Sequence, residues 1–350
     1  MSAHKQIRTD IRRSARKKSR KLVLSLFLLA AVLSLAALCM GNYPLPVADV
    51  LRILFSKVLP IERTWTATME TVIFLVRVPR ICAALLIGSA LSLSGAVYQG
   101  VFRNPLVSPD LLGVASGACV GAAAAILLGL NRVFIQIFAL CCGLLAVWIT
   151  TAIPRLLRND STMTLVLAGI IVAGFMTSML GLAKYIADPE RQLAEITYWT
   201  LGSLSMVKSE TLFSVLPVMA VAAFALLSMR WRVNLLSLGD QQALTLGVNV
   251  KTTRGITILC STALTGCAVC ISGNVGWIGL VIPHLSRIVA GPDNSRLLPV
   301  AALIGACFML IVDTLSRTVT AAEIPLSILT GFVGAPLYVW LLFHQRVKLK

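Results

Sequence analysis

Asp313 and Arg317 have the clearest spacing for chemistry in this sequence. They stand four positions apart in an apolar run, so a helix would place them on one face. The simpler interpretation is a local ion pair, and the alternative is a proton relay through a membrane. The other apolar runs are almost free of acids. A transporter driven by ion coupling would therefore have few other acidic side chains in these runs to bind a proton or another ion.

Signatures of enzymatic chemistry are absent from the sequence. No Gly-x-x-x-x-Gly-Lys loop is present that could cradle a phosphate. The histidines His4, His284 and His344 are scattered and form no metal-ligand set, and no spacing indicates a Ser/His/Asp arrangement. We predict that the chain is not an enzyme, has no ATPase site and uses no cofactor or resident metal. If it moves a solute uphill, the energy comes from another subunit.

The composition is that of a membrane protein. Of the 350 residues, 57% are hydrophobic and 13% are charged, whereas soluble domains have about 25% charged residues. A lipid core about 30 Å thick needs roughly 20 apolar residues per helix. We predict an all-α membrane protein with ten transmembrane helices. The expected spans are 22–41, 81–101, 111–130, 134–153, 162–184, 211–229, 255–272, 275–290, 297–316 and 325–343.

Basic residues orient these spans. Nine of the first 21 residues are Lys or Arg, which is typical of a cytosolic segment before a first span. The net charge of +17 is therefore explained without nucleic acid. With ten spans and the N-terminus inside, 21 of the 31 Lys and Arg residues lie inside. We expect a basic segment 1–21, one membrane domain 22–343 and a tail 344–350, with both termini in the cytosol.

Three segments are expected outside the lipid. Residues 45–59 read as an amphipathic helix on the outer side, and residues 188–204 as an outer connection. Residues 230–254 form the longest inner loop. Within it, helix-forming residues lie between Gly239 and Gly247, with apolar residues facing the cytosol. Such a patch often marks a partner site, and a helix lying on the lipid interface is the alternative.

Three arginines stand at outer helix ends in this topology. Arg77 and Arg80 begin the second span in an Arg-Val-Pro-Arg sequence, and Arg317 ends the ninth. Basic residues are disfavoured on this side, although a rim arginine can snorkel. The planar guanidinium binds a carboxylate through two parallel hydrogen bonds. We predict that the three form a ring that accepts carboxylates from a docking protein.

Long ordered motifs show a family resemblance. The sequence resembles the FecCD-type permeases of ABC transporters, which import iron-siderophores, haem or vitamin B12. The matching stretches are Arg77-Val-Pro-Arg80, Gly88 to Gln99, Arg103-Asn104-Pro105 to Gly113, Gly276 to Arg287, Glu323-Ile-Pro325 and Gly334-Ala-Pro336. The departures are Trp277, where the family commonly has phenylalanine, and Ser327, where it usually has glycine.

The resemblance implies an assembly. Two ten-helix permease subunits of the type II ABC importer fold, either two copies or one with a paralogue, would surround a central pathway in the lipid bilayer. An extracytoplasmic substrate-binding protein would dock on Arg77, Arg80 and Arg317. Two cytosolic ABC ATPase subunits would receive the coupling segment 237–250. Its contact residues would be Leu238, Gly239, Asp240, Gln241, Ala243, Leu244, Leu246 and Gly247.

Two proline motifs near the inner boundary need a separate interpretation. Proline ends or bends a helix and frees backbone groups. We therefore assign Asn104 and Pro105, and Pro283, His284 and Arg287, a structural or gating role. His284 and Arg287 would bind backbone or lipid headgroups. No residue reads as a specific ligand for the cargo.

The predicted function is transport. We expect an importer permease in the cell inner (cytoplasmic) membrane that moves an iron chelate of the siderophore class, driven by the partner's ATP hydrolysis. Cobalamin, haem or an oxyanion such as molybdate are alternative cargoes. An ion-coupled secondary transporter is an alternative from another class, and a non-transporting membrane scaffold is a third.

Overall fold

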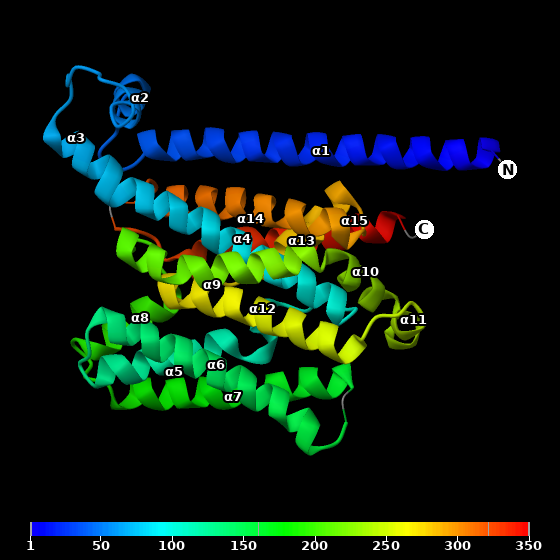
Figure 1. The fold of residues 1–350 in the computed structure, drawn as a ribbon. Helices are drawn as coiled ribbons and strands as arrows, with labels where there is room; N and C mark the ends of the chain where they lie inside the picture. The colour runs from blue at the N-terminus through cyan, green and yellow to red at the C-terminus, as the bar shows by residue number, and fades with distance from the viewer. Residues whose placement is uncertain (1, 160, 321, 349–350) are drawn as a thin grey trace.

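Helices form the regular elements of the described chain, and most run along one common direction (Figure 1). This computed structural model describes residues 2–159, 161–320 and 322–348. The elements are α1 (Ser2–Cys39), α2 (Val47–Phe55), α3 (Ala67–Thr71), η1 (Val72–Arg77), α4 (Val78–Val101), η2 (Pro109–Leu112), α5 (Val114–Leu127), α6 (Arg132–Leu156), α7 (Thr162–Ile186), α8 (Gln192–Leu201), α9 (Ser209–Ser228), α10 (Arg230–Leu238), α11 (Asp240–Thr245), α12 (Val250–Ser272), α13 (Ile278–Ala290), α14 (Asn294–Ser316) and α15 (Leu326–Lys348).

The apolar helices match the runs predicted from the sequence. Seven helical stretches in the described chain are long and apolar enough to cross a membrane: Ser19–Cys39, Ala67–Val101, Arg132–Leu156, Thr162–Ile186, Ser209–Ser228, Val250–Ser272 and Asn294–Ser316. Three shorter apolar helices, Val114–Leu127, Ile278–Ala290 and Leu326–Leu341, lie where the third, eighth and tenth spans were expected. The prediction of an all-helical membrane protein is confirmed.

The two ends of the bundle carry different short elements. Both chain termini lie at the same end as α10 and α11, whereas α2, α3 and α8 lie at the opposite end (Figure 1). The expected amphipathic helix is α2, which buries Val50 and Ile53 against the bundle. The end that carries α2 is therefore the outer end of the predicted topology, and the end that carries the termini is the inner one.

One expected boundary is wrong, and two expected connections contain short helices. The second span does not begin near residue 81, because α3, the π-helical turn η1 and α4 continue into one another from Ala67. Pro79 follows that π-helical turn, where the widened backbone accommodates a residue without an N–H. The outer connection 188–204 contains the helix α8, and the inner loop 230–254 contains α10 and α11. Short helices like these leave weak periodicity in a sequence.

The core is built around α4. This helix is buried on nearly its whole surface between α12, α13 and α14. Small residues permit backbone contact: a Cβ added at Gly88 would lie 2.2 Å from the carbonyl oxygen of Gly305 on α14. One added at Gly95 would lie 1.9 Å from that of Gly279 on α13. In lipid, such close packing replaces the hydrophobic drive that water supplies to soluble bundles.

Candidate functional site

The three outer arginines lie inside the protein. Arg77, Arg80 and Arg317 are 4%, 5% and 7% exposed, so none of them presents its guanidinium openly at the outer surface, and their role in docking stays a prediction. The first two fall within the continuous helix 67–101, where their side chains are buried although Leu75 and Val76 beside them are exposed. Each guanidinium therefore needs partners within the chain.

Two of these side chains, Arg77 and Arg317, cap the C-terminal end of α1. Arg317 donates from Nη1 to the carbonyl oxygen of Met40 at 2.6 Å and from Nη2 to that of Ala37. Arg77 donates to the carbonyl oxygens of Leu38 and Tyr43. The last carbonyls of a helix have no partner in the helix itself, and they form the negative end of its dipole. The arginines supply both the missing donors and the favourable charge.

Arg80 holds two acids from the other end of the chain. Its Nε donates to Asp313 Oδ1 at 2.8 Å, and Nη1 and Nη2 donate to the two carboxylate oxygens of Glu323 at 2.6 and 3.0 Å. The predicted contact between Asp313 and Arg317 is also present, with 3.7 Å between Oδ2 and Nε. Because Asp313 is fully buried between two guanidiniums, the ion-pair interpretation fits it better than the proton relay.

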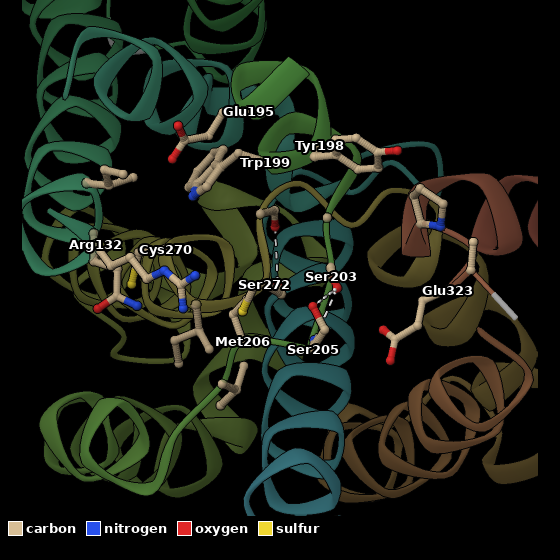
Figure 2. A pocket seen from close by; sticks show the side chains of 18 residues that line it. Arg132, Glu195, Tyr198, Trp199, Ser203, Ser205, Met206, Cys270, Ser272 and Glu323 are labelled. Carbon is tan, nitrogen blue, oxygen red and sulfur yellow. Dashed lines mark hydrogen bonds between the residues drawn. The ribbon is translucent and has the colours of Figure 1, made fainter. Parts of the chain in front are cut away.

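Glu323 also lines a cavity at the outer end (Figure 2). The cavity has a volume of about 640 Å³ and is walled by α6, α8, the outer end of α12 and the segments around 202–207 and 322–325. Most of the lining is apolar or aromatic, including Tyr198, Trp199 and Met206, and Arg132, Glu195 and Glu323 supply the charges. The sequence did not predict this cavity, because its lining residues come from four separated stretches of the chain, 132–136, 195–207, 270–273 and 322–325.

The inner end presents α11 between two glycines. Gly239 and Gly247 have φ values of +122° and +81°, which a residue with a side chain would adopt only with strain. Leu238, Leu244 and Leu246 are 56%, 59% and 58% exposed, as the interpretation of an apolar cytosolic patch requires. Gln241 is exposed as well.

One predicted contact residue of this segment faces inward. Ala243 is completely buried, and Gly239 is buried too, so neither presents a side chain to a partner. Along the short helix α11, Ala243 is buried and its neighbour Leu244 is exposed. Ala243 therefore belongs to the side of α11 that packs on the bundle.

Polar anchors fix the coupling segment to the bundle. Asp240 Oδ1 accepts a hydrogen bond from Arg254 Nη2 on α12 at 2.7 Å and lies 3.8 Å from Arg103 Nη2. Asn234 on α10 donates to Asp293 Oδ1 at 2.6 Å and accepts from the Asn294 N–H at 2.7 Å. Apart from Asp240, the sequence did not single out these residues, since an isolated polar residue in a loop carries no pairing signal.

Asp293 keeps its charge at this junction. Burial raises its pKa, but hydrogen bonds from Asn234 and Ser295 and the charge of Arg296 outweigh burial, so the pKa lies below its ordinary value. Asp293 also caps α14, because its side chain accepts from the N–H of Ser295 at 2.9 Å. The carboxylate therefore joins α10 to the start of α14.

Residues of both proline motifs make hydrogen bonds to other residues of the chain. Asn104 Oδ1 accepts from the Leu106 N–H at 2.9 Å and closes a turn over Pro105, and both Asn104 and Pro105 are exposed. Arg287 donates to Gln99 Oε1 on α4. Its guanidinium thus binds a side chain of the bundle, where a backbone or headgroup partner was expected.

Pro283 and His284 lie inside α13. The ring of His284 is buried and meets the ring of Tyr338 on α15 edge-on, with 5.9 Å between centroids. Among the described residues, neither ring nitrogen of His284 has a hydrogen-bond partner, and the Tyr338 hydroxyl has none either. Gating by these residues stays a prediction.

Residues 28–344 match the FecCD transport family, which is nine-tenths of the sequence. The chain belongs to the FecCD family. It is 38% identical to the molybdate import system permease of Haemophilus influenzae, over 93% of this chain and 96% of that protein. It is 39% identical to a protein of Helicobacter pylori described as an iron chelatin transport system permease, over 80% of this chain and 85% of that one.

A solved ABC transporter structure has the same fold. An inward-facing metal-chelate type ABC transporter superposes with a TM-score of 0.84 and 37% identity, covering 93% of this chain and 99% of that one. This protein is therefore a permease subunit of an ABC importer, in a family that has no ATPase domain of its own. The family resemblance predicted from the motifs is confirmed.

Several glycines of the FecCD motifs lie at close helix contacts. Gly88, Gly95 and Gly279 belong to these motifs and lie where α4 touches α14 and α13. A Cβ added at Gly334 would lie 2.7 Å from the Cβ of Trp277. Trp277 itself has φ +70°, a strained value for a large residue, at the start of α13. The departure from phenylalanine therefore falls at a close contact between α13 and α15.

Proposed function

We propose that this FecCD permease imports an iron chelate of the siderophore class. The outer cavity carries the proposal. Its volume of about 640 Å³ lies within the roughly 300–1,000 Å³ of sites for drug-sized ligands, and its apolar and aromatic lining suits a chelate. A bare oxyanion would use only the few donors of the lining, such as Arg132, Ser203 and Ser205, would leave the aromatic surface unused, and would be repelled by Glu195.

Molybdate is the second candidate. Arg132 stands at the cavity and could attract an oxyanion. The test is uptake of ⁵⁵Fe as a ferric siderophore and of ⁹⁹Mo-molybdate by cells that carry this permease with its own ATPase and binding protein, against the same cells without the permease. Saturable iron uptake alone supports the proposal, and molybdate uptake alone overturns it. Haem and cobalamin, tested in the same way, distinguish the other chelates.

We further propose that ten helices cross the cell inner membrane, with both termini in the cytosol. The three shorter apolar helices would reach the interfaces with their flanking residues. Exposed apolar side chains such as Ile170, Ile171 and Phe175 on α7 fit contact with lipid or with a second permease copy or paralogue. Site-specific labelling of single cysteines placed in 43–46 and 246–249 from either side of the membrane tests the orientation.

The inner end is proposed to receive the ATPase subunits. Leu238 at the end of α10, Leu244 on α11 and Leu246 directly after α11 form an exposed apolar patch, and α11 is anchored through Asp240, which suits insertion into a cleft of a partner. Leu244→Asp with Leu246→Asp should uncouple the ATPase. Unaltered co-purification with the ATPase and unaltered transport would count against this role. ATP-dependent uptake that withstands a protonophore separates this drive from ion coupling.

The outer end is proposed to receive the binding protein near Arg80. Arg77 and Arg317 would support that surface through α1, because their own donors are engaged with its carbonyls. At the inner boundary, Asn104 and Pro105 and the contact of His284 with Tyr338 are proposed to move during gating.

A further inference from the structure

The guanidinium of Arg80 is not open to a carboxylate from another protein. Its side chain is 7% exposed, and it already bonds Asp313 and both carboxylate oxygens of Glu323. The two acids differ in their access to solvent: the side chain of Asp313 is fully buried, and that of Glu323 is 32% exposed. A partner's carboxylate could reach the guanidinium fork only by replacing Glu323.

The surroundings make such a replacement feasible. Glu323 lines the outer cavity, so a displaced side chain has a volume of about 640 Å³ in which its charge can be solvated. Exchanging one carboxylate for another preserves the charge-assisted hydrogen bonds of the fork. Simple loss of Glu323 would leave Nη1 and Nη2 of the buried Arg80 without acceptors, with only Nε still bonded to Asp313, so exchange for another carboxylate is favoured over loss.

We propose that Glu323 occupies the docking position of a binding-protein carboxylate, and that docking displaces it from Arg80. This inference rests on the proposed function, because it assumes that the binding protein docks near Arg80. It adds that the free permease blocks its own docking site with a side chain of the same chemistry.

The segment that follows Glu323 is hydrogen-bonded to neighbouring helix ends, so displacement of Glu323 would affect how α15 is held. The Ile324 N–H donates to the Ser316 carbonyl at the end of α14 at 3.1 Å, and the Leu326 N–H donates to that of Gly202 after α8 at 3.0 Å. The Ser327 hydroxyl donates to the Asn274 carbonyl before α13 at 2.6 Å. The first turn of α15 is thus bound to three neighbours directly beside Glu323. Release of Glu323 loosens this junction and links docking to α15.

The test is Glu323→Gln in the permease assembled with its ATPase in lipid nanodiscs. The amide keeps the size of the side chain but has no negative charge and only one acceptor oxygen, so it pairs more weakly with Arg80, which retains Asp313. The probe is the cargo-free binding protein of the same import system. We expect its affinity for the variant to rise about tenfold. ATPase activity without the binding protein should also rise. Glu190→Gln is the matched control, since this acid is exposed at the outer end, and it should change neither value.

The outcomes distinguish the docking role of Arg80 from the displacement of Glu323. Unchanged or weaker binding by Glu323→Gln overturns the exchange. If the double variant Arg80→Gln/Glu323→Gln binds as well as the wild type, the docking role of Arg80 is wrong. If the double variant loses binding while Glu323→Gln binds as the wild type does, docking stands and the exchange is wrong.

A measurement on the wild-type complex covers the case in which the variants do not assemble. Docking should raise deuterium uptake in peptides that cover 322–327, because their hydrogen bonds loosen when Glu323 leaves. A fall in uptake, or no change, would mean that Glu323 stays on Arg80 when the binding protein docks.

Discussion

Arg317 Nη1 lies 2.6 Å from the carbonyl oxygen of Met40 and donates to it where α1 ends. The two residues are 277 positions apart in the chain. Many side chains of α1, such as Phe27 and Leu28, face away from the bundle, so this helix has little interior packing of its own. The arginine contacts at its C-terminal end therefore hold α1 to α14.

Replacing Arg317 should detach this end of α1. Arg317→Met leaves buried carbonyls without donors and Asp313 with one guanidinium fewer, and we expect a loss of about 3 kcal/mol in stability. Thermal unfolding of the purified permease in detergent measures it. Arg52→Met on α2, whose side chain is 54% exposed, is the control and should cost under about 1 kcal/mol. Equal effects of the two substitutions would contradict the capping role.

Arg254→Gln should weaken coupling between the ATPase and transport. The substitution removes the charge-assisted bond to Asp240, and with it the anchor of α11 on α12. Because Asp240 is partly exposed, we expect a cost of about 1 kcal/mol and a decrease in transport of about fivefold. Transport per ATP hydrolysed in proteoliposomes is the measurement. Arg232→Gln, in the exposed part of α10, should leave this ratio unchanged. A decrease shared by both variants would point to a general charge effect.

Sequence patterns predicted the helices well, because lipid leaves an apolar chain few other conformations. Each expected span corresponds to a helix, usually within a few residues. The errors occur where polar groups interrupt the pattern. The helix α8 and the early start at Ala67 were missed because polar residues there resemble a loop in one dimension.

The outer arginines show what a sequence cannot reveal about a site. Their position on the disfavoured side correctly marked them as unusual. Whether a guanidinium points outward or into the bundle depends on partners such as Met40 and Glu323, which lie 277 and 243 positions away from Arg317 and Arg80. No local pattern encodes such pairs, so their burial required the fold.

Gly88→Ala should destabilise the contact between α4 and α14. The added methyl group would lie 2.2 Å from the Gly305 carbonyl oxygen, and two helix backbones would have to separate. We expect a cost of about 1–3 kcal/mol, as for overpacked cores. Gly255→Ala on α12 has no atom within 4 Å of the new methyl group and should be neutral or stabilising. The melting temperatures of both variants test this contrast, which would fail if the two shifted alike.

Asp293 should make the stability of the inner junction depend on pH in the acid range. Its folded-state pKa lies below the ordinary value, so folding favours the ionised carboxylate. That stabilisation is fully present above about pH 4, the ordinary aspartate value, and is lost as the pH falls through the lowered pKa. Melting temperatures of wild type and Asp293→Asn between pH 6 and pH 3 are the measurement. The wild type should melt higher at pH 6, and the difference should shrink below about pH 4. A difference that stays constant over this range would mean that Asp293 stabilises the junction through its shape and hydrogen bonds, with no contribution from its charge.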